Sequence, residues 1–297
     1  MVLHEDEVAV DVQLISRLLA EQAPDVAHLQ PVEVGVRGSS NAVHRLGEGL
    51  CTRLPRAERF VEDLERERRW LAHLRSYVSL AVPEVVAVGR PGCGYPFPWA
   101  IYRWVEGEPY DPALVDDETA AGAGLARFVD GLRSAPLPTD APAGGRAPLA
   151  SLAEQTRGAI AACAPELGAS GVQAALNAWE GALQSPVWDG RAVWVHADLL
   201  PLNLTVSSGV LHGVIDFGTV GVGDPAADVI AAWTLFGPEG RAAYRAGLDV
   251  DEGTWARGRG YALHQAANIV WYYRKTHPGF AASAAGTIRR VLEDQRS

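Results

Sequence analysis

The sequence is short of lysine, cysteine and long apolar runs. Lys275 is the only lysine, so any chemistry for which proteins usually employ a lysine elsewhere must here use arginine. The cysteines, Cys51, Cys93 and Cys163, are too scattered for a disulfide framework or a paired metal site, which fits a reducing compartment. No apolar run approaches the roughly 20 residues that span a bilayer. The N-terminal MVLHEDEVAV has acids where a signal peptide needs basic and apolar residues. We therefore expect a cytoplasmic protein with no membrane partner.

The chain also lacks an excess of basic charge. Asp and Glu number 36 against 26 Lys and Arg, which gives a formal net charge of −10. Because nucleic-acid-binding proteins usually carry a basic face, we expect no nucleic-acid partner. Hydrophobic residues make up 48% of the 297 residues, enough for a sizeable core. This composition excludes disordered, collagen-like and coiled-coil proteins.

The hydrophobic pattern divides the chain into two lobes. Residues 1–105 contain a predicted helix at 8–22, several short β-rich runs separated by Gly and Ser, and a strong helical stripe over 59–75. In residues 106–297 helical stretches dominate, interrupted by a Pro- and Gly-rich loop at 136–148. The pattern predicts an α+β protein with a small N-terminal antiparallel sheet lobe and a larger, mainly helical C-terminal lobe.

Glu67 lies on the apolar face of the predicted helix at 59–75. The other residues of this face follow one another at helical spacing: Phe60, Leu64, Leu71 and Leu74. A glutamate is almost never buried without a partner, so a core-facing Glu67 requires a cation. The alternative is that Glu67 lies at the margin of the face and is solvated.

Two polar segments flank a predicted β-hairpin in the second lobe. HADLLPLN (196–203) precedes the hairpin and VIDFG (214–218) ends it. Asn203 comes just before the first strand and Asp216 just after the second, so both lie at the open end. An amide oxygen and a carboxylate suit Mg²⁺, and Asp198 is left free to orient or deprotonate a hydroxyl group. Aspartate also caps turns, but capping does not explain both carboxylates with Asn203 between them.

The order H-x-D-x₄-N, IDFG and GVGDPAAD (221–228) resembles the aminoglycoside phosphotransferase family of protein-kinase-like small-molecule kinases, over roughly residues 32–275. The resemblance implies a bilobal protein-kinase-like fold and transfer of the γ-phosphoryl group of ATP or GTP to a small-molecule hydroxyl. It implies Asp198 as the catalytic residue, and Asn203 and Asp216 as Mg²⁺ ligands.

The acceptor remains open at this stage. The resemblance favours an aminoglycoside-type antibiotic, and an acidic C-terminal lobe would attract a cationic acceptor. A macrolide, another antibiotic or a hydroxylated primary metabolite are alternatives. A nucleotide-binding pseudokinase that regulates a partner is the alternative of another class, and the missing lysine is its support.

The resemblance places the nucleotide in the N-terminal lobe. GVRGSSNAVHRL (35–46) matches a phosphate-covering hairpin with four small or polar residues at its tip, Gly38, Ser39, Ser40 and Asn41. An ordinary hairpin turn would look the same. Arg53 stands at the position of the phosphate-binding lysine and Glu67 at that of its partner. A guanidinium can hold phosphates and a carboxylate together.

Further site residues follow from the same resemblance. Tyr102, Arg103 and Val105 match the hinge that binds the purine, with Tyr102 as the gatekeeper. We expect three residues to have structural roles: His196, Asp224 and Asp228. The helix at 261–275 places a polar and aromatic stripe that would line the acceptor pocket: His264, Asn268, Trp271 and Tyr272. A half-exposed helix face would show the same pattern.

Overall fold

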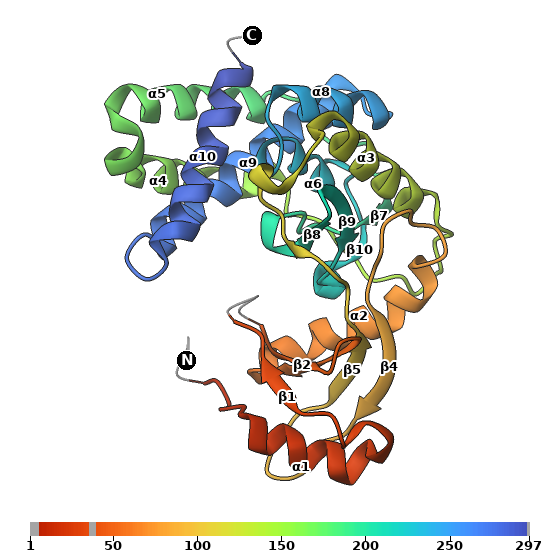
Figure 1. Ribbon diagram of the computed structural model, residues 1–297. Helices are drawn as coiled ribbons and strands as arrows, with labels where there is room; N and C mark the ends of the chain where they lie inside the picture. The colour runs from red at the N-terminus through yellow and green to blue at the C-terminus, as the bar shows by residue number, and fades with distance from the viewer. Residues whose placement is uncertain (1–5, 36–39, 296–297) are drawn as a thin grey trace.

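The computed structural model describes residues 6–35 and 40–295, which form two lobes (Figure 1). The N-terminal lobe is a five-stranded antiparallel sheet with the strand order β1-β2-β3-β5-β4. Its strands are β1 (Pro31–Glu33), β2 (Asn41–Leu46), β3 (Leu50–Pro55), β4 (Glu84–Gly89) and β5 (Trp99–Arg103). Gly47, at φ 59°, closes the tight β2–β3 turn.

A helix covers each face of this sheet. Helix α1 (Val12–Gln22) packs on one face, and α2 (Val61–Leu74) lies between the other face and the C-terminal lobe (Figure 1). Side chains along β5 alternate between these faces, so that Ile101 belongs to the α1 cluster and Tyr102 to the core shared with α2.

The first helix is shorter than predicted. It begins at Val12 rather than at residue 8. Asp11 caps the N-terminus of the helix, because its carboxylate accepts a hydrogen bond of 2.7 Å from the Leu14 amide. Helix α2 has the predicted register, and Glu67 is buried on it with an exposed fraction of 1%.

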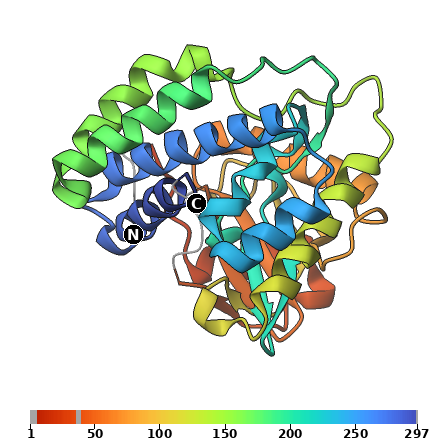
Figure 2. The same cartoon turned by 90° about the horizontal axis from the view of Figure 1, so that it is seen from above.

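The C-terminal lobe is mainly helical. Its helices are α3 (Glu118–Ser134), α4 (Ala153–Ala162), α5 (Ala164–Leu183, kinked at Gly168), α6 (Ala226–Val229), α7 (Ala231–Thr234), α8 (Pro238–Gly247), α9 (Glu252–Tyr273) and α10 (Pro278–Asp294). Seen from above, α4, α5, α9 and α10 gather on one side of the lobe (Figure 2). Short 3₁₀ turns occupy Pro24–Val26, Glu58–Phe60, Pro112–Leu114, Leu149–Leu152, Pro201–Asn203 and Phe217–Thr219.

Two small sheets of the C-terminal lobe face the N-terminal lobe. One pairs β7 (Val193–Val195) with β10 (Gly221–Gly223); the other has the order β6-β8-β9, with β6 (Glu108–Pro109), β8 (Leu204–Ser207) and β9 (Val210–Val214). The chain passes from β5 of the large sheet to β6 of the small one, where the sequence predicts the lobe boundary.

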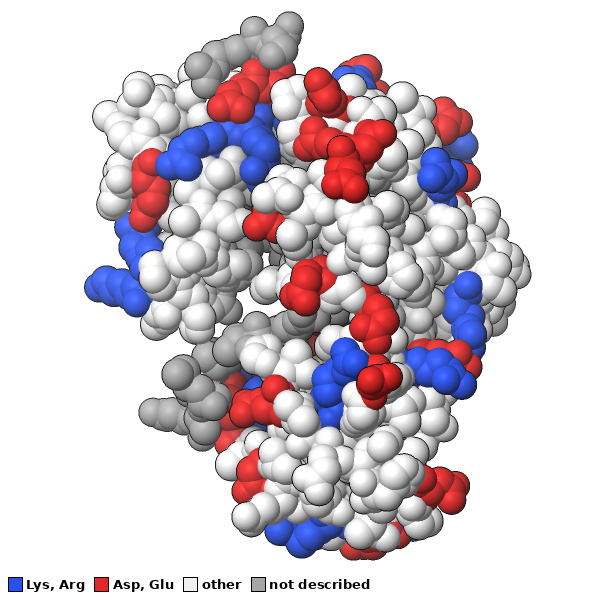
Figure 3. Space-filling model, in the orientation of Figure 1, with Lys and Arg blue, Asp and Glu red and all other residues white. Residues whose placement is uncertain are grey.

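A hollow opens between the two lobes on the face shown in Figure 3, where acidic and basic side chains are scattered over both lobes. The lobes also contact each other directly, because Trp70 of α2 packs on Trp194 of β7 with ring centroids 5.1 Å apart. None of the helices that the structure describes is long and apolar enough to cross a bilayer.

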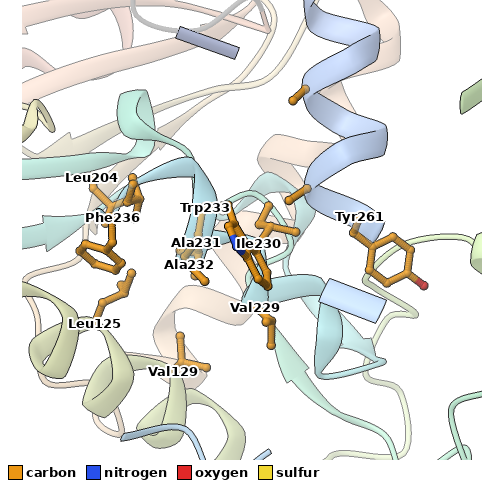
Figure 4. Close-up of a cluster of buried hydrophobic side chains, with 14 of the residues drawn as sticks. Leu125, Val129, Leu204, Val229, Ile230, Ala231, Ala232, Trp233, Phe236 and Tyr261 are labelled. Carbon is orange, nitrogen blue, oxygen red and sulfur yellow. The ribbon is translucent and has the colours of Figure 1, made fainter. Parts of the chain in front are cut away.

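The core of the C-terminal lobe supports the segment that carries HADLLPLN. Residues 229–236 run through the centre of this core, and Figure 4 shows Ile230 and Trp233 among the apolar side chains of neighbouring elements. Both are fully buried. The nearby Thr234 hydroxyl donates a hydrogen bond of 3.0 Å to the Leu199 carbonyl. The buried core therefore fixes the position of the polar loop that follows β7.

Candidate active site

The β8–β9 hairpin brings the two predicted polar segments together. Leu204 pairs with Val214, and the Ile215 amide donates a hydrogen bond of 2.8 Å to the Asn203 carbonyl. Asn203 precedes the first strand and Asp216 follows the second, so both side chains line one pocket between the lobes. The local pairing of the hairpin produces this arrangement.

The 196–203 loop is held by buried hydrogen bonds. The fully buried Asp228 carboxylate accepts them from the amides of His196, at 3.0 Å, and Ala197, at 2.7 Å. The His196 ring accepts one from the Asp198 amide at 3.3 Å, and its Nε2 lies 3.2 Å from the Ile215 carbonyl oxygen. These contacts place His196 and Asp228 where structural roles are expected.

Asp224 is also engaged in the framework. Its carboxylate accepts two hydrogen bonds from Arg257, at 2.8 and 3.0 Å, and one from the Ala226 amide at 2.9 Å. Both side chains of the ion pair are more than nine-tenths buried. Asp224 therefore fixes the loop before α6 to helix α9.

Two amide side chains hold the Asp198 carboxylate. Asn203 Nδ2 donates to its Oδ2 at 2.8 Å, and Gln265 Nε2 of α9 donates to its Oδ1 at 3.2 Å. Burial raises the pKa of Asp198, while the nearby Arg146 guanidinium opposes this rise. The carboxylate is thus fixed in direction by its two amide partners.

Arg53 bridges two carboxylates from different lobes. Its Nη1 donates to both oxygens of Glu67 at 2.7 and 2.6 Å, and its Nη2 donates to Asp216 Oδ1 at 2.8 Å. The Phe217 amide donates to Glu67 Oε2 at 2.8 Å. Burial opposes the charge of Arg53, but the two carboxylates raise its pKa well above the ordinary value. Burial likewise disfavours the charged Asp216, yet Arg53 lowers the pKa of this carboxyl.

The backbone of Asp216 is strained. Its φ of 66° and ψ of 70° lie in the left-handed region, which a residue other than glycine rarely adopts. The ion pair with Arg53 and the adjoining Phe217–Glu67 hydrogen bond hold it there. In this conformation Asp216 lines the pocket beside Asn203.

The oxygen ligands present suit a magnesium ion. Asn203 Nδ2 donates to both the carbonyl and the carboxylate of Asp198, at 2.9 and 2.8 Å, so the amide oxygen is directed away from Asp198. One amide oxygen and the Asp216 carboxylate make an incomplete set of hard ligands, which Mg²⁺ completes with water and phosphate oxygens. Among the described residues, no group of three or more His, Cys, Asp or Glu forms a metal cage.

A mainly apolar pocket adjoins these residues. It encloses about 620 Å³, part of it open to solvent. Its lining comes from both lobes and includes Val43, Cys51, Tyr102, Trp104, Val105, Leu202 and Ile215. The Tyr102 ring is fully buried, and Arg53 Cζ lies 5.8 Å from its centroid. The Arg103 side chain is two-thirds exposed and pairs with Glu84, and this residue also borders the pocket.

A second, smaller pocket connects the hinge side to Asp198. Its lining includes Ser40, Asn41, Arg53, Asp63, Glu67, Asp198, Asp216, Gly218 and Thr219. Asn41 is buried, and its Oδ1 has no hydrogen-bond partner among the described residues. Gly38 and Ser39, the other predicted tip residues, lie outside the described residues.

Asp63 is a site residue that the sequence reasoning missed. It lines the smaller pocket together with Asp216, and burial, with the Asp216 charge adding to it, raises its pKa. Asp63 comes four residues before Glu67 on α2, so helical spacing puts both on one side of the helix. That spacing was the signal available in the sequence.

The predicted acceptor stripe on α9 divides into two parts. His264 Nδ1 lies 2.8 Å from the Thr156 hydroxyl of α4, and Asn268 Oδ1 accepts from Gln155 at 3.0 Å, so both contact α4. Burial lowers the pKa of His264 to about 4. Trp271 and Tyr272 are more than half exposed. The structure does not bring these four residues together beside Asp198.

A neighbouring face of α9 borders a groove beside Asp198. The residues that line this groove, which we call the α9–α10 groove, are Leu200, Pro201, Thr234, Gln265, Ala266, Ile269, Phe280, Ser283, Ala284 and Thr287. Gln265 belongs to this groove and binds Asp198. The helical pattern shows which residues share a face but not which neighbour the face meets, so the sequence alone did not select this one.

The fold is similar to solved antibiotic kinases. A GDP complex of a mutant of aminoglycoside 2'-phosphotransferase-IIIa superposes with a TM-score of 0.70 at 17% identity, covering 97% of this chain and 99% of that one. ADP-bound APH(2'')-Ib gives 0.60 at 16%, covering 96% and 99%. The macrolide 2'-phosphotransferase MphH from Brachybacterium faecium gives 0.59 at 20%, covering 94% and 97%. At these identities the likeness shows a shared protein-kinase-like fold.

Sequence comparison identifies the family. No curated protein matches the sequence significantly. A model of the phosphotransferase enzyme family, APH, matches residues 31–261, which is most of the chain. The matched region contains both polar segments of the hairpin and the Arg53–Glu67 pair. The chain therefore belongs to the APH phosphotransferase enzyme family.

Proposed function

We propose that this protein transfers the γ-phosphoryl group of a nucleoside triphosphate to a hydroxyl group of a small molecule. The observation that carries the proposal is the convergence of Asp198, Asn203 and Asp216 with the Arg53–Glu67 pair on connected pockets between the lobes. Such transfer depends mainly on positioning and charge neutralisation, so few residues are needed.

Each side chain has a role that its contacts support. Asp198 orients the acceptor hydroxyl and accepts its proton, because its carboxylate is fixed and borders the smaller pocket. Arg53 faces the same pocket and donates to phosphate oxygens, with Glu67 setting its direction. Asn203 and Asp216 would hold Mg²⁺, which neutralises phosphate charge when bound.

The missing lysine gives little support to a pseudokinase. Arg53 makes the carboxylate pair that the phosphate-binding lysine is expected to make, with two hydrogen bonds to Glu67. A guanidinium also binds phosphate well, since its donors form a planar fork. A regulatory, non-catalytic role is therefore the weaker candidate, and measurement of turnover tests it.

We infer that the nucleotide choice depends on Tyr102. Tyr102 is one of the residues that line the apolar pocket where the purine would lie, its side chain is fully buried, and in this family an aromatic gatekeeper is associated with GTP use. Solved relatives include both a GDP complex and an ADP complex. Both ATP and GTP are therefore candidate donors.

Substituting Tyr102 tests this inference. Wild type is expected to use GTP at least as well as ATP, and Tyr102→Ala should raise kcat/KM for ATP about tenfold by opening the pocket. Tyr102→Phe keeps the ring and serves as the control, with an unchanged preference. A wild type that prefers ATP, or a preference that Tyr102→Ala leaves in place, contradicts the inference.

Two acceptor classes have support. The sequence favours an aminoglycoside, and one solved relative is a complex with GDP and kanamycin. The α9–α10 groove favours a macrolide or another weakly charged acceptor, because the described residues that line it carry no charge and include the apolar Leu200, Ile269 and Phe280. Polycations are usually recognised by carboxylates, which this groove does not supply.

An acceptor screen decides between these classes and tests the function. We expect wild type with Mg²⁺ and ATP or GTP to add one phosphate to at least one hydroxylated antibiotic, detected by mass spectrometry. Phosphorylation of a macrolide but not of kanamycin would support the neutral groove as the acceptor site. Nucleotide binding with neither transfer to any acceptor nor hydrolysis of the triphosphate would contradict the proposal and favour a pseudokinase.

A further inference from the structure

The Pro- and Gly-rich segment 136–148 joins helix α2 to the 196–203 loop. On the α2 side, His73 Nε2 lies 3.0 Å from the Pro136 carbonyl oxygen, Arg66 donates to the Ala143 carbonyl at 3.2 Å, and Arg69 pairs with Asp140. The segment therefore contacts the same helix that carries Glu67.

Glycines fix the other side of this segment against β10. The Gly144 amide donates to the Val222 carbonyl at 3.0 Å, and the Val222 amide donates to Pro142 at 2.8 Å. A Cβ atom on Gly144 would lie 2.4 Å from the Gly221 Cα, so only glycine permits this approach. Gly145 then turns the chain with a φ of 86°. The packing leaves little freedom in where the next residue, Arg146, is placed.

Arg146 reaches the residues around Asp198 by two routes. Its Nη2 donates to Gln265 Oε1 at 2.9 Å, and Gln265 Nε2 donates in turn to Asp198 Oδ1 at 3.2 Å. The same Nη2 donates to the Ala197 carbonyl at 3.0 Å. Ala197 has a φ of 68°, so the contact also supports a strained backbone directly before Asp198.

The guanidinium fixes the orientation of Gln265. A glutamine amide can present either its oxygen or its nitrogen to a carboxylate, and only the nitrogen is a donor. Because Arg146 occupies the Gln265 oxygen, the amide nitrogen must face Asp198. The 196–203 loop contains no lysine or arginine of its own, so the positive charge beside it comes from another part of the chain.

We propose that Arg146 is a positioning residue for Asp198, acting through Gln265 and the Ala197 carbonyl to aim the carboxylate at the acceptor hydroxyl. This inference rests on the proposed phosphoryl transfer. Arg146 does not line the pockets that border Asp198 and Asp216, so its effect is on the direction of the carboxylate and not on contacts with either substrate.

Steady-state kinetics of Arg146→Met and Arg146→Lys test the proposal. Methionine retains the apolar stem and removes both hydrogen bonds, so kcat should fall about 100-fold, as expected for a misdirected catalytic group. The KM for nucleotide should change less than about threefold, since neither Arg146 nor Gln265 lines the two pockets that border Asp216. Lysine restores the charge and a donor nitrogen on a differently shaped side chain, and should recover part of kcat. Added guanidinium, at concentrations far below denaturing ones, should partly rescue Arg146→Ala.

Arg274→Met is the matched control. Arg274 is also a half-buried arginine of this lobe whose Nη2 donates to a backbone carbonyl, that of Ala162. Its other polar partners among the described residues are Val270 and Glu166, so none of these contacts goes to the 196–203 loop. Its substitution should lower stability without lowering kcat. An Arg146→Met variant that keeps kcat within about threefold of wild type, or loses it only in proportion to the Arg274 control, would overturn the proposal.

A crystal structure of Arg146→Met separates this inference from the proposed function. If wild type transfers no phosphate, the proposed function fails, and the side-chain positions still test the positioning by Arg146. The inference predicts that Gln265 releases Asp198 and that the carboxylate rotates. An unmoved Asp198 and Gln265 in the variant would overturn it, whatever the activity of the wild type.

Discussion

Replacing Asp198 by alanine is expected to abolish phosphoryl transfer while nucleotide binding is retained. Its carboxylate is the group in the 196–203 loop that we assign to the acceptor hydroxyl, whereas Asn203 and Asp216 are assigned to the metal. A general base contributes roughly 10²–10⁴-fold to a rate. Because positioning of the hydroxyl is lost as well, kcat should fall at least 10³-fold. Single-turnover transfer and equilibrium binding of the Mg²⁺–nucleotide measure the two effects separately.

Asp189→Ala is the control for this experiment. Asp189 is an exposed carboxylate of the same lobe that pairs with Arg191, at 3.4 Å, and lies away from the site. Its removal should leave kcat unchanged. If Asp198→Ala retained more than about a tenth of the wild-type kcat, the assignment of the catalytic residue would be wrong. Loss of nucleotide binding in the variant would instead indicate that Asp198 contributes to the metal site.

Features set by local sequence were predictable. The hairpin between Asn203 and Asp216 follows from strand alternation and a short turn, so the meeting of the two side chains could be inferred without knowledge of the rest of the fold. The burial of Glu67 follows in the same way from the helical spacing of the apolar residues of α2. Its partner could be named from the family pattern, and the structure gives the pair as two hydrogen bonds.

Contacts between distant elements were not predictable. The second arm of Arg53 binds Asp216, 163 positions further along the chain, and no local pattern connects the two residues. The orientation of α9 is a similar case, because the periodicity of His264 and Asn268 defines a stripe but not the helix that it meets. That helix is α4. Gln265, the residue that follows His264 in the sequence, contacts Asp198 instead.

For the segment 136–148, the sequence predicts the loop but not its conformation. Its proline and glycine content correctly predicts a loop, and the composition alone does not distinguish a mobile loop from one in a fixed conformation. The fixed conformation depends on the close packing of Gly144 on Gly221, a tertiary contact between two glycines. The position of Arg146 beside Gln265 follows from that contact and was therefore not available from the sequence.

Breaking the buried Arg53–Glu67 pair is expected to lower both stability and activity. The side chains of Arg53 and Glu67 are 12% and 1% exposed, so the pair is buried. Removing one partner of a buried pair costs about 3–5 kcal/mol, compared with about 0–1 kcal/mol for an exposed pair. Glu67→Ala should therefore lower the free energy of unfolding by several kcal/mol, measured by denaturant titration. It also leaves the Phe217 amide without its acceptor.

Glu67→Gln separates charge from volume. The glutamine fills the same space but no longer balances Arg53, so the guanidinium should pair more strongly with Asp216, which it already contacts at 2.8 Å. A carboxylate held by arginine is less available to Mg²⁺, and the phosphates lose a correctly oriented donor. We expect kcat/KM for the nucleotide to fall at least tenfold, because Arg53 is no longer correctly placed to contact the phosphates in the transition state. We also expect the enzyme to need a higher Mg²⁺ concentration.

Glu62→Gln on the same helix is the control. Glu62 pairs with Arg66 at 3.1 Å, but its side chain is 83% exposed, so the change should cost less than about 1 kcal/mol and leave kinetics unchanged. The comparison holds helix, residue type and substitution constant and varies burial and contact with the site. If both glutamine variants behaved alike, the Arg53–Glu67 pair would have no role in orienting the nucleotide. A Glu67→Gln variant that was unstable yet fully active when folded would show that the pair stabilises the N-terminal lobe but does not contribute to activity.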